Sequence, residues 1–162
     1  MATRSGSVDP GLLLYLLTRQ GVAPAELDEV LNERAGLLGV SGVSADLRAV
    51  LAAAEAGAER AGLAYAMFVH SLVRTVGAMA AVLGGLDALV FTGGIGEHSP
   101  RVRREVAAAF AYAGLTLDET ASEAPVGDAD VAARDSSVRV LVIAAREDLA
   151  VLGEVRRLLA TR

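Results

Sequence analysis

Apolar residues recur at helical spacing through the first half of the chain. Leucines at positions 12, 13, 16 and 17 form one stripe after Asp9-Pro10, a pair that favours the start of a helix. Pro24 starts a second stripe, which the segment Gly36–Gly42 breaks. The predicted helices span residues 10–17, a segment from residue 24 to the break, residues 46–56, and an alanine-rich stretch of about 59–83 that ends at two glycines.

The second half alternates between strands and helices. The continuous apolar run Leu86–Phe91 predicts a buried strand, and Val138–Ile143 predicts another. Pro100–Ala113 predicts a helix between them, and Glu147–Leu159 predicts the last helix. Leu115–Ser137 is polar, so we expect a loop with a short edge strand. This order implies parallel neighbouring strands joined by a right-handed crossover.

These patterns predict an α/β fold in which residues 10–85 are mainly helical and residues 86–162 form a β-α-β-α unit. A parallel sheet normally has several strands and helices on both faces. Two parallel strands are too few for an independent sheet of this type, so we expect an incomplete one.

The composition is unusually apolar. Hydrophobic residues make up 53% of the 162 positions, and the mean hydropathy is +0.44. Only 4% of the residues are aromatic, so the core must consist of alanine, valine and leucine. We expect apolar surface that needs a cover, either by association into a homo-oligomer or by a partner chain.

Charge and residue usage exclude several classes of function. The net charge of −5 argues against nonspecific nucleic-acid binding, which needs a basic surface. The absence of cysteine excludes thiol chemistry and zinc–thiolate sites, and it fits a cytoplasmic location. His70 and Arg74 interrupt the longest apolar region, so no unbroken run reaches the roughly 18 residues of a membrane span. No secretory signal pattern is visible either. We therefore expect a cytoplasmic protein with neither a nucleic acid nor a membrane as partner.

A glycine-rich segment follows the first predicted strand. Gly93, Gly94 and Gly96 allow the backbone to approach a ligand closely, and Ser99-Pro100 favours the start of a helix. Such a segment often binds a phosphate. The third glycine of a dinucleotide fingerprint is missing, and the chain has no lysine for a P-loop. The local pattern alone leaves a simple packing corner open.

Four blocks of sequence, in order, resemble the acetate kinase family. The segment from Phe91 to Ser99, followed by Val102-Arg103, resembles the family's carboxyl-half signature, with His98 where the family usually has asparagine. The other three blocks are Thr3–Gly11, Ser41–Arg48 and Val142–Leu149. They are distributed across the whole chain.

The resemblance implies that the chain is the carboxyl-terminal lobe, residues 1–162, of a protein more than twice as long. It would be truncated or half of a split protein. The implied fold is an incomplete ribonuclease-H-like lobe of the acetate- and sugar-kinase/actin superfamily. The missing strands would precede Met1.

The resemblance also assigns two charged residues to catalysis. It implies that Arg4 stabilises the transition state, a role suited to a planar and always-charged guanidinium. It implies that Glu147 helps to hold Mg²⁺ on the phosphates of ATP or ADP. The residues alone leave open a surface arginine and an acid that stabilises a helix N-terminus. Arg146 stands where the family has asparagine, and it could neutralise Glu147.

Two segments correspond to the family's nucleotide-binding residues. Without the resemblance, the first could be an N-capping acid followed by a solvated arginine, and the second a packing corner. The implied adenosine contacts are Asp46, Leu47 and Arg48, and the implied loop on the adenosine and its phosphates is Gly94, Ile95, Gly96, Glu97 and His98.

The resemblance implies transfer of the ATP γ-phosphoryl group to acetate, which gives acetyl phosphate and ADP. The family's acetate pocket belongs to the amino-terminal half, so we expect the isolated chain to be inactive, with the missing lobe as its partner. Alternatives are a propionate kinase, a non-catalytic adenine-nucleotide-binding module or gene remnant, and, less favoured, half of a dinucleotide-binding domain.

Overall fold

A computed structural model describes residues 2–160 of the chain and divides it into two compact units. The first unit extends to Thr75 and the second begins at Val76, so the longest helix contributes to both. The fold is α/β and rich in helices, as the sequence predicts.

The first unit is helical. Asp9 caps the first helix by accepting a hydrogen bond from the backbone N–H of Leu12 at 3.1 Å, and Pro10 occupies the first turn, where its missing N–H costs nothing. Pro24 starts the second helix in the same way. The helices are α1 (Pro10–Thr18), α2 (Pro24–Glu33), α3 (Gly36–Ser41), α4 (Leu47–Glu55) and α5 (Glu59–Leu83).

The helix that begins at Pro24 ends at Glu33, before the predicted break at Gly36–Gly42, but residues 36–41 themselves form a separate helix, α3. Gly36 and Gly42 adopt left-handed conformations (φ +61° and +68°) that end the neighbouring turns without interrupting the helix between them. Inside α3, a Cβ on Gly39 would lie 2.6 Å from the carbonyl oxygen of Arg34. These glycines therefore allow a short helix to form against the end of α2.

The core of the first unit lies among these helices. Arg60, at the start of α5, donates hydrogen bonds to the carbonyl oxygens of Val40 (2.9 Å) and Gly39 (3.0 Å), which fixes α5 to the end of α3. The buried apolar side chains are Leu27, Leu37, Leu47, Val50, Ala61, Ala64, Tyr65 and Phe68.

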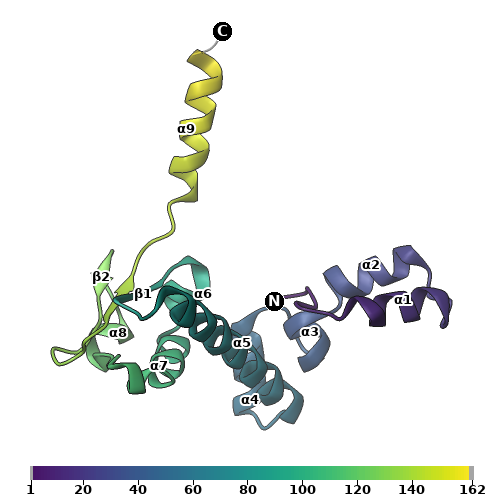
Figure 1. Cartoon of the computed structure of the whole chain (residues 1–162), viewed down its shortest axis with the longest axis horizontal. Coiled ribbons are helices and arrows are strands. Elements are labelled where there is room, and N and C mark those ends of the chain that lie inside the picture. The colour runs from purple at the N-terminus through teal and green to yellow at the C-terminus, as the bar shows by residue number, and fades with distance from the viewer. Residues whose placement is uncertain (1, 161–162) are drawn as a thin grey trace. The chain divides into compact units, whose positions relative to one another are not determined.

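The second unit is built on a three-stranded sheet (Figure 1). Strand β1 (Ala88–Phe91) pairs in parallel with β3 (Arg139–Val142), as predicted, and β2 (Ala129–Asp130) pairs with β3 in the antiparallel sense. The remaining elements are α6 (Gly93–His98), α7 (Pro100–Ala108), the 3₁₀ turn η1 (Ala111–Ala113), α8 (Glu119–Glu123) and α9 (Glu147–Ala160).

Three predictions for this unit need correction. The glycine-rich segment, expected to precede a helix at Ser99-Pro100, is itself the helix α6. The helix predicted to reach Ala113 ends at Ala108, because the backbone tightens into η1 before Gly114 (φ +82°). The segment Leu115–Ser137 contains the predicted edge strand β2 and also α8, which Asp118 caps through the N–H of Ala121 at 2.9 Å.

Strand β1 exists but is less buried than its apolar sequence suggests. It lies at the edge of the sheet, Phe91 is its one buried residue, and Val90 is 50% exposed. The central strand β3 provides the buried positions Val140 and Val142. No residue of α9 up to Ala160 is buried.

Helix α5 is long and apolar enough to cross a membrane by length and composition, with a mean hydropathy of 1.6 over its best window. Charged residues interrupt every long apolar run in the sequence, but an 18-residue window of high mean hydropathy can still include one or two of them. A single helix of this kind says little alone. Arg74 inside the helix would be costly at a bilayer centre. The amino-terminal part of α5 packs in the core of the first unit through Ala61 and Phe68, whereas only 6% of the apolar window is buried.

Phe110 is the largest apolar anchor of the second unit. It is 2% exposed and lies against α5 at Gly77, whereas Tyr112 nearby is 82% exposed. We predict that Phe110→Ala lowers the free energy of unfolding by about 3–5 kcal/mol. Tyr112→Ala should lower it by at most about 1 kcal/mol, the value of an aromatic pair. Urea unfolding followed by circular dichroism measures both, and equal losses would contradict this account of the core.

Candidate functional site

The two parallel strands deliver candidate residues to one edge of the sheet. Phe91 at the end of β1 pairs with Val142 at the end of β3, so both strands leave the sheet at the same edge. Helix α6 follows β1, and Glu147 follows β3 after a short segment. In open α/β sheets, ligands bind outside the carboxyl ends of the strands. This edge is therefore the candidate site in the second unit.

Glycine occupies positions 93, 94 and 96 of α6 for different structural reasons. Gly93 has φ +71°, a conformation that favours glycine. A Cβ on Gly96 would lie 3.2 Å from the backbone carbon of Phe91, so Gly96 allows α6 to pack on β1. A Cβ on Gly94 would meet nothing within 4 Å. Neither backbone strain nor packing requires glycine at position 94, and its surroundings are open to a ligand.

Glu97 connects α6 to the segment that precedes Glu147. Its Oε1 accepts a hydrogen bond from the backbone N–H of Ala145 at 2.9 Å. Asp128 holds the adjacent residue, because its Oδ1 accepts from the N–H of Ala144 at 3.0 Å. Beside these contacts is a hollow of about 200 Å³, the strand-end pocket, which is lined by Glu97, His98, Pro125, Gly127, Val142 and Ala144.

Arg146 pairs with Asp128 and not with the adjacent Glu147. Its Nη2 lies 3.0 Å from Asp128 Oδ2. The backbone hydrogen bond from Ala144, and then Arg146, lower the pKa of Asp128 below its ordinary value. Glu147 is exposed in the first turn of α9. The neutralisation of Glu147 by Arg146 that the sequence left open is not the arrangement in the structure.

Glu147 is suited to bind a metal ion whose remaining coordination positions are filled by other ligands. Residues 2–160 contain no group of three or more acidic, histidine or cysteine side chains that could hold a metal ion alone. Mg²⁺, however, binds well to one or two carboxylates when water and phosphate oxygens fill its remaining positions. An exposed carboxylate whose neighbouring arginine is engaged elsewhere fits that requirement.

His98 closes the last turn of α6. Its Nδ1 lies 3.0 Å from the carbonyl oxygen of Gly94, and the ring is exposed. Ile95 is partly exposed on the same helix. The side chains of His98 and Ile95 and the backbone at Gly94 thus lie on a short, accessible helix.

The predicted triplet Asp46-Leu47-Arg48 belongs to the first unit. Asp46 caps α4 by accepting from the N–H of Arg48 at 2.9 Å, and the Arg48 side chain folds back onto the same carboxylate, with Nη2 2.6 Å from Oδ2. Leu47 is buried. The hydrogen bonds from the side chain and then the backbone of Arg48 lower the pKa of Asp46 to about 2. The acid and the arginine form one local unit whose guanidinium is exposed.

Arg4 also belongs to the first unit, and its side chain is exposed. Its backbone is held on both sides: Ser5 donates to the carbonyl of Leu31 at 2.9 Å, and Ala35 donates to the carbonyl of Thr3 at 2.8 Å. Arg4 is therefore not on a loose terminus. The structure brings α6 and Glu147 to one edge within the second unit, and it describes Arg4 and Asp46–Arg48 within the first.

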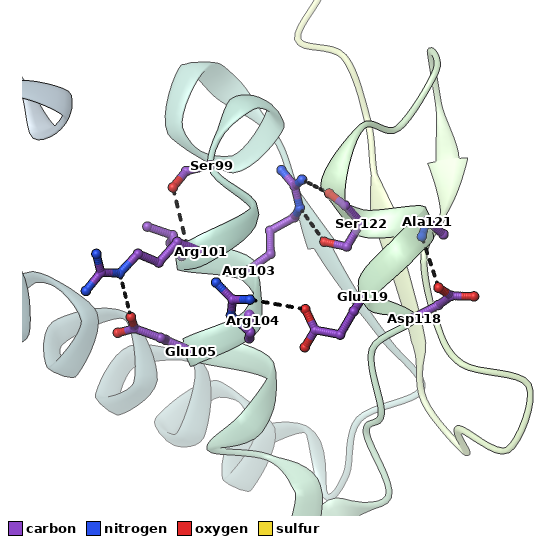
Figure 2. Close-up of polar contacts among 10 residues, drawn as sticks. Ser99, Arg101, Arg103, Arg104, Glu105, Asp118, Glu119, Ala121 and Ser122 are labelled. Carbon is purple, nitrogen blue, oxygen red and sulfur yellow. Dashed lines mark hydrogen bonds and ion pairs between the residues drawn. The ribbon is translucent and has the colours of Figure 1, made fainter. Parts of the chain in front are cut away.

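Sequence reasoning assigned no role to Arg103. It is completely buried. Its guanidinium contacts Ser122 in α8 (Figure 2) and the carbonyl oxygen of Gly96 in α6. Helical spacing could have suggested this, because Arg103 shares a face of α7 with the buried residues Val106 and Ala107.

A family model matches this chain. The model of the acetokinase family covers residues 1–153. An acetate kinase from a Cyanothece species is 47% identical over 161 residues, which is 99% of this chain and 40% of that protein. The chain thus spans about 40% of the length of such relatives.

Solved structures of similar proteins agree with this match. The acetate kinase of Porphyromonas gingivalis has a TM-score of 0.87 at 38% identity, covering 98% of this chain and 40% of its own. A propionate kinase from Francisella tularensis has a TM-score of 0.81 at 34% identity, covering 92% and 38%. The likeness confirms the predicted partial actin-like α/β fold.

The pairing of Asp46 with Arg48 predicts an unusual titration. A lowered pKa in the folded chain means that the pair is intact above the ordinary value of 3.8 and is lost as the pH falls through about 2. In Arg48→Gln, the midpoint of Asp46 should rise towards 3.8. Carboxyl carbon NMR measures this. Arg34→Gln removes another exposed arginine of the same unit and should leave Asp46 unchanged.

Proposed function

Because the chain belongs to the acetokinase family, we propose that it supplies the nucleotide-binding part of an acetate kinase. The complete reaction transfers the γ-phosphoryl group of ATP to a carboxylate oxygen of acetate, and the bond between that group and ADP breaks. The products are acetyl phosphate and ADP. The observation that carries this proposal is the convergence of open Gly94 and the Glu147 segment at one sheet edge, joined by Glu97 and Ala145.

In this proposal, α6 lies against the nucleotide. Gly94 offers accessible backbone, Ile95 offers an apolar contact, and His98 retains a ring nitrogen for hydrogen bonding because Nδ1 is near Gly94. Asp46 and Arg48, which are exposed, would contact the adenosine, and Leu47 belongs to the same triplet. Leu47 is buried and anchors the triplet in the first unit. Asp46 orders the side chain of Arg48, whose exposed guanidinium would face the adenosine. Gly96 and Glu97 chiefly fix α6 in place.

We propose that Glu147 helps to hold Mg²⁺ on the nucleotide phosphates. The ion would neutralise phosphate charge when bound. Asp128 supports this role because it engages Arg146 and keeps that cation away from Glu147. Arg4 would stabilise charge on the equatorial oxygens of the transferring phosphoryl group, since its guanidinium is exposed on a backbone held at Thr3 and Ser5.

Two alternatives remain within reach of experiment. The similarity to a propionate kinase makes a longer acyl acceptor an alternative to acetate. The other alternative is a module that binds adenine nucleotide without catalysis. Nucleotide binding alone supports both readings, whereas phosphoryl transfer in the presence of a complementary chain supports only the enzyme.

We propose that the chain works with a partner in the cytoplasm, either the complementary part of the family's fold or a second copy of itself. Large apolar side chains stand exposed at the end of α5 and along α9, where a partner could cover them. These include Val82, Leu83, Leu149, Val151, Leu158 and Leu159.

Nucleotide binding tests the role of α6. We predict that Mg·ADP binds with a dissociation constant no tighter than roughly high micromolar, because one lobe offers incomplete contacts. Gly94→Ala should weaken binding severalfold without loss of stability, since its Cβ enters open space and alanine favours a helix. Gly62→Ala is the matched control, with equally open surroundings in α5. Calorimetry measures both, and unchanged binding in Gly94→Ala would make α6 only a packing element.

The metal role of Glu147 predicts a specific loss. Glu147→Gln should reduce the gain in ADP affinity that Mg²⁺ provides by roughly tenfold, the scale of lost metal-site support. Binding of ADP in the presence of a chelator should stay nearly the same. Asp148→Asn removes a neighbouring carboxylate of the same helical turn and serves as the control. Equal effects of the two substitutions would indicate a general charge effect and not a metal ligand.

Phosphoryl transfer needs groups from both sides of the nucleotide. We therefore predict that the chain alone shows no acetate-dependent release of ADP from ATP above background. A coupled assay for ADP, with and without acetate, measures this. Acetate-dependent activity that Arg4→Ala abolishes and Arg19→Ala preserves would show that the chain is a complete catalyst.

A further inference from the structure

Arg103 is a cation without access to solvent. It lies in α7 with 0% exposure, and its guanidinium donates in two directions. Nη1 donates to the carbonyl oxygens of Gly96 (2.7 Å) and Glu97 (2.9 Å) in α6. Nε donates to Ser122 Oγ at 3.1 Å, and Nη2 donates to the Ser122 carbonyl in α8. Four acceptors from two separate helices thus surround one side chain.

The partners of Arg103 are carbonyls and a hydroxyl, with no carboxylate bonded to it. Burial lowers its pKa, and the charge of Glu123 opposes that change. An arginine remains charged in such a place, so its donors must be satisfied locally. The carbonyls at the end of α6 are suited to this, because a helix C-terminus carries partial negative charge and leaves carbonyls without partners in the helix.

The two helices that Arg103 joins both border the strand-end pocket. Glu97 and His98 of α6 line it, and so do Pro125 and Gly127, which follow α8. Glu97 is held twice: Arg103 binds its carbonyl, and Ala145 binds its carboxylate. A shift of α6 would therefore move the pocket wall and also the segment before Glu147.

We propose that Arg103 is a positioning residue that fixes the spacing between α6 and the α8 side of the strand-end pocket, and thereby the placement of Gly94 and Glu147. The expected effect of Arg103 on nucleotide affinity rests on the proposed function. Its expected effect on the local stability of α6 does not depend on that function.

The neighbouring Arg104 provides a control. Arg104 also joins α7 to α8, through an exposed ion pair with Glu119 at 3.6 Å, but it does not reach α6 (Figure 2). Ion pairs of this kind contribute little to stability. Arg104→Met thus removes a cation from the same helix and a link to the same partner, while it leaves the α6 contacts intact.

The test compares Arg103→Lys, Ser122→Ala and Arg104→Met in the full chain by amide hydrogen exchange, with circular dichroism as a check of folding. A lysine ammonium is a compact donor that cannot reproduce a planar fork between two helices. In Arg103→Lys, exchange in residues 93–98 should therefore accelerate at least about tenfold, the scale of one lost charge-assisted hydrogen bond. Ser122→Ala should give a smaller increase, and Arg104→Met should match the wild type.

Two results would overturn the proposal. One is unchanged exchange at residues 93–98 in Arg103→Lys, and the other is an increase of the same size throughout the second unit, which means general destabilisation. If Arg103→Lys fails to fold, Ser122→Ala decides the question by the same local criterion.

Calorimetry with Mg·ADP then separates this proposal from the proposed function. Weaker binding in Arg103→Lys, at temperatures where the variant stays folded, supports both. If the wild type binds no ADP while exchange still accelerates locally at α6, the proposed function fails and the positioning role stands.

Discussion

The parallel pairing of β1 with β3 is the constraint on which the candidate site depends. Its register sets Phe91 beside Val142, so the chain leaves both strands at the same edge. The antiparallel β2 covers the other side of β3 and brings Asp128 near that edge. Carboxylates of Glu97 and Asp128 then bind consecutive backbone amides of the segment that follows β3. These two hydrogen bonds and the register of β1 on β3 fix the backbone of the residues just before Glu147.

Much of the fold could be predicted from local rules. Asp9, Pro10 and Pro24 start helices because capping and ring geometry act within one turn, and the bounds of α5 follow from its continuous pattern. The predictions fail where glycine residues flank or lie within a helix and do not end it. Gly36 and Gly42 bracket a helix, and Gly93 and Gly96 accommodate another, although both segments have the sequence of a break or a turn.

The site was less predictable because its supporting contacts join distant residues. Glu97 binds a backbone amide 48 residues away, and no local pattern reveals that partner. Arg103 shares a helical face with the buried residues Val106 and Ala107, but a charged residue in a helix usually lies in solvent. The carbonyls of α6 and the acceptors of Ser122 in α8 explain its burial. The family motifs identified the segments, while the structure distinguishes the supporting residues from the accessible ones.

The exposed side of β1 has a consequence for handling the protein. In the described part of the chain, β1 pairs with β3 alone, so its other side presents free amide and carbonyl groups beside the half-exposed Val90. A strand edge of this kind is a template for an additional strand from another molecule. Concentrated samples are therefore prone to edge-to-edge aggregation, and a charged residue at position 90 is a rational solubilising change.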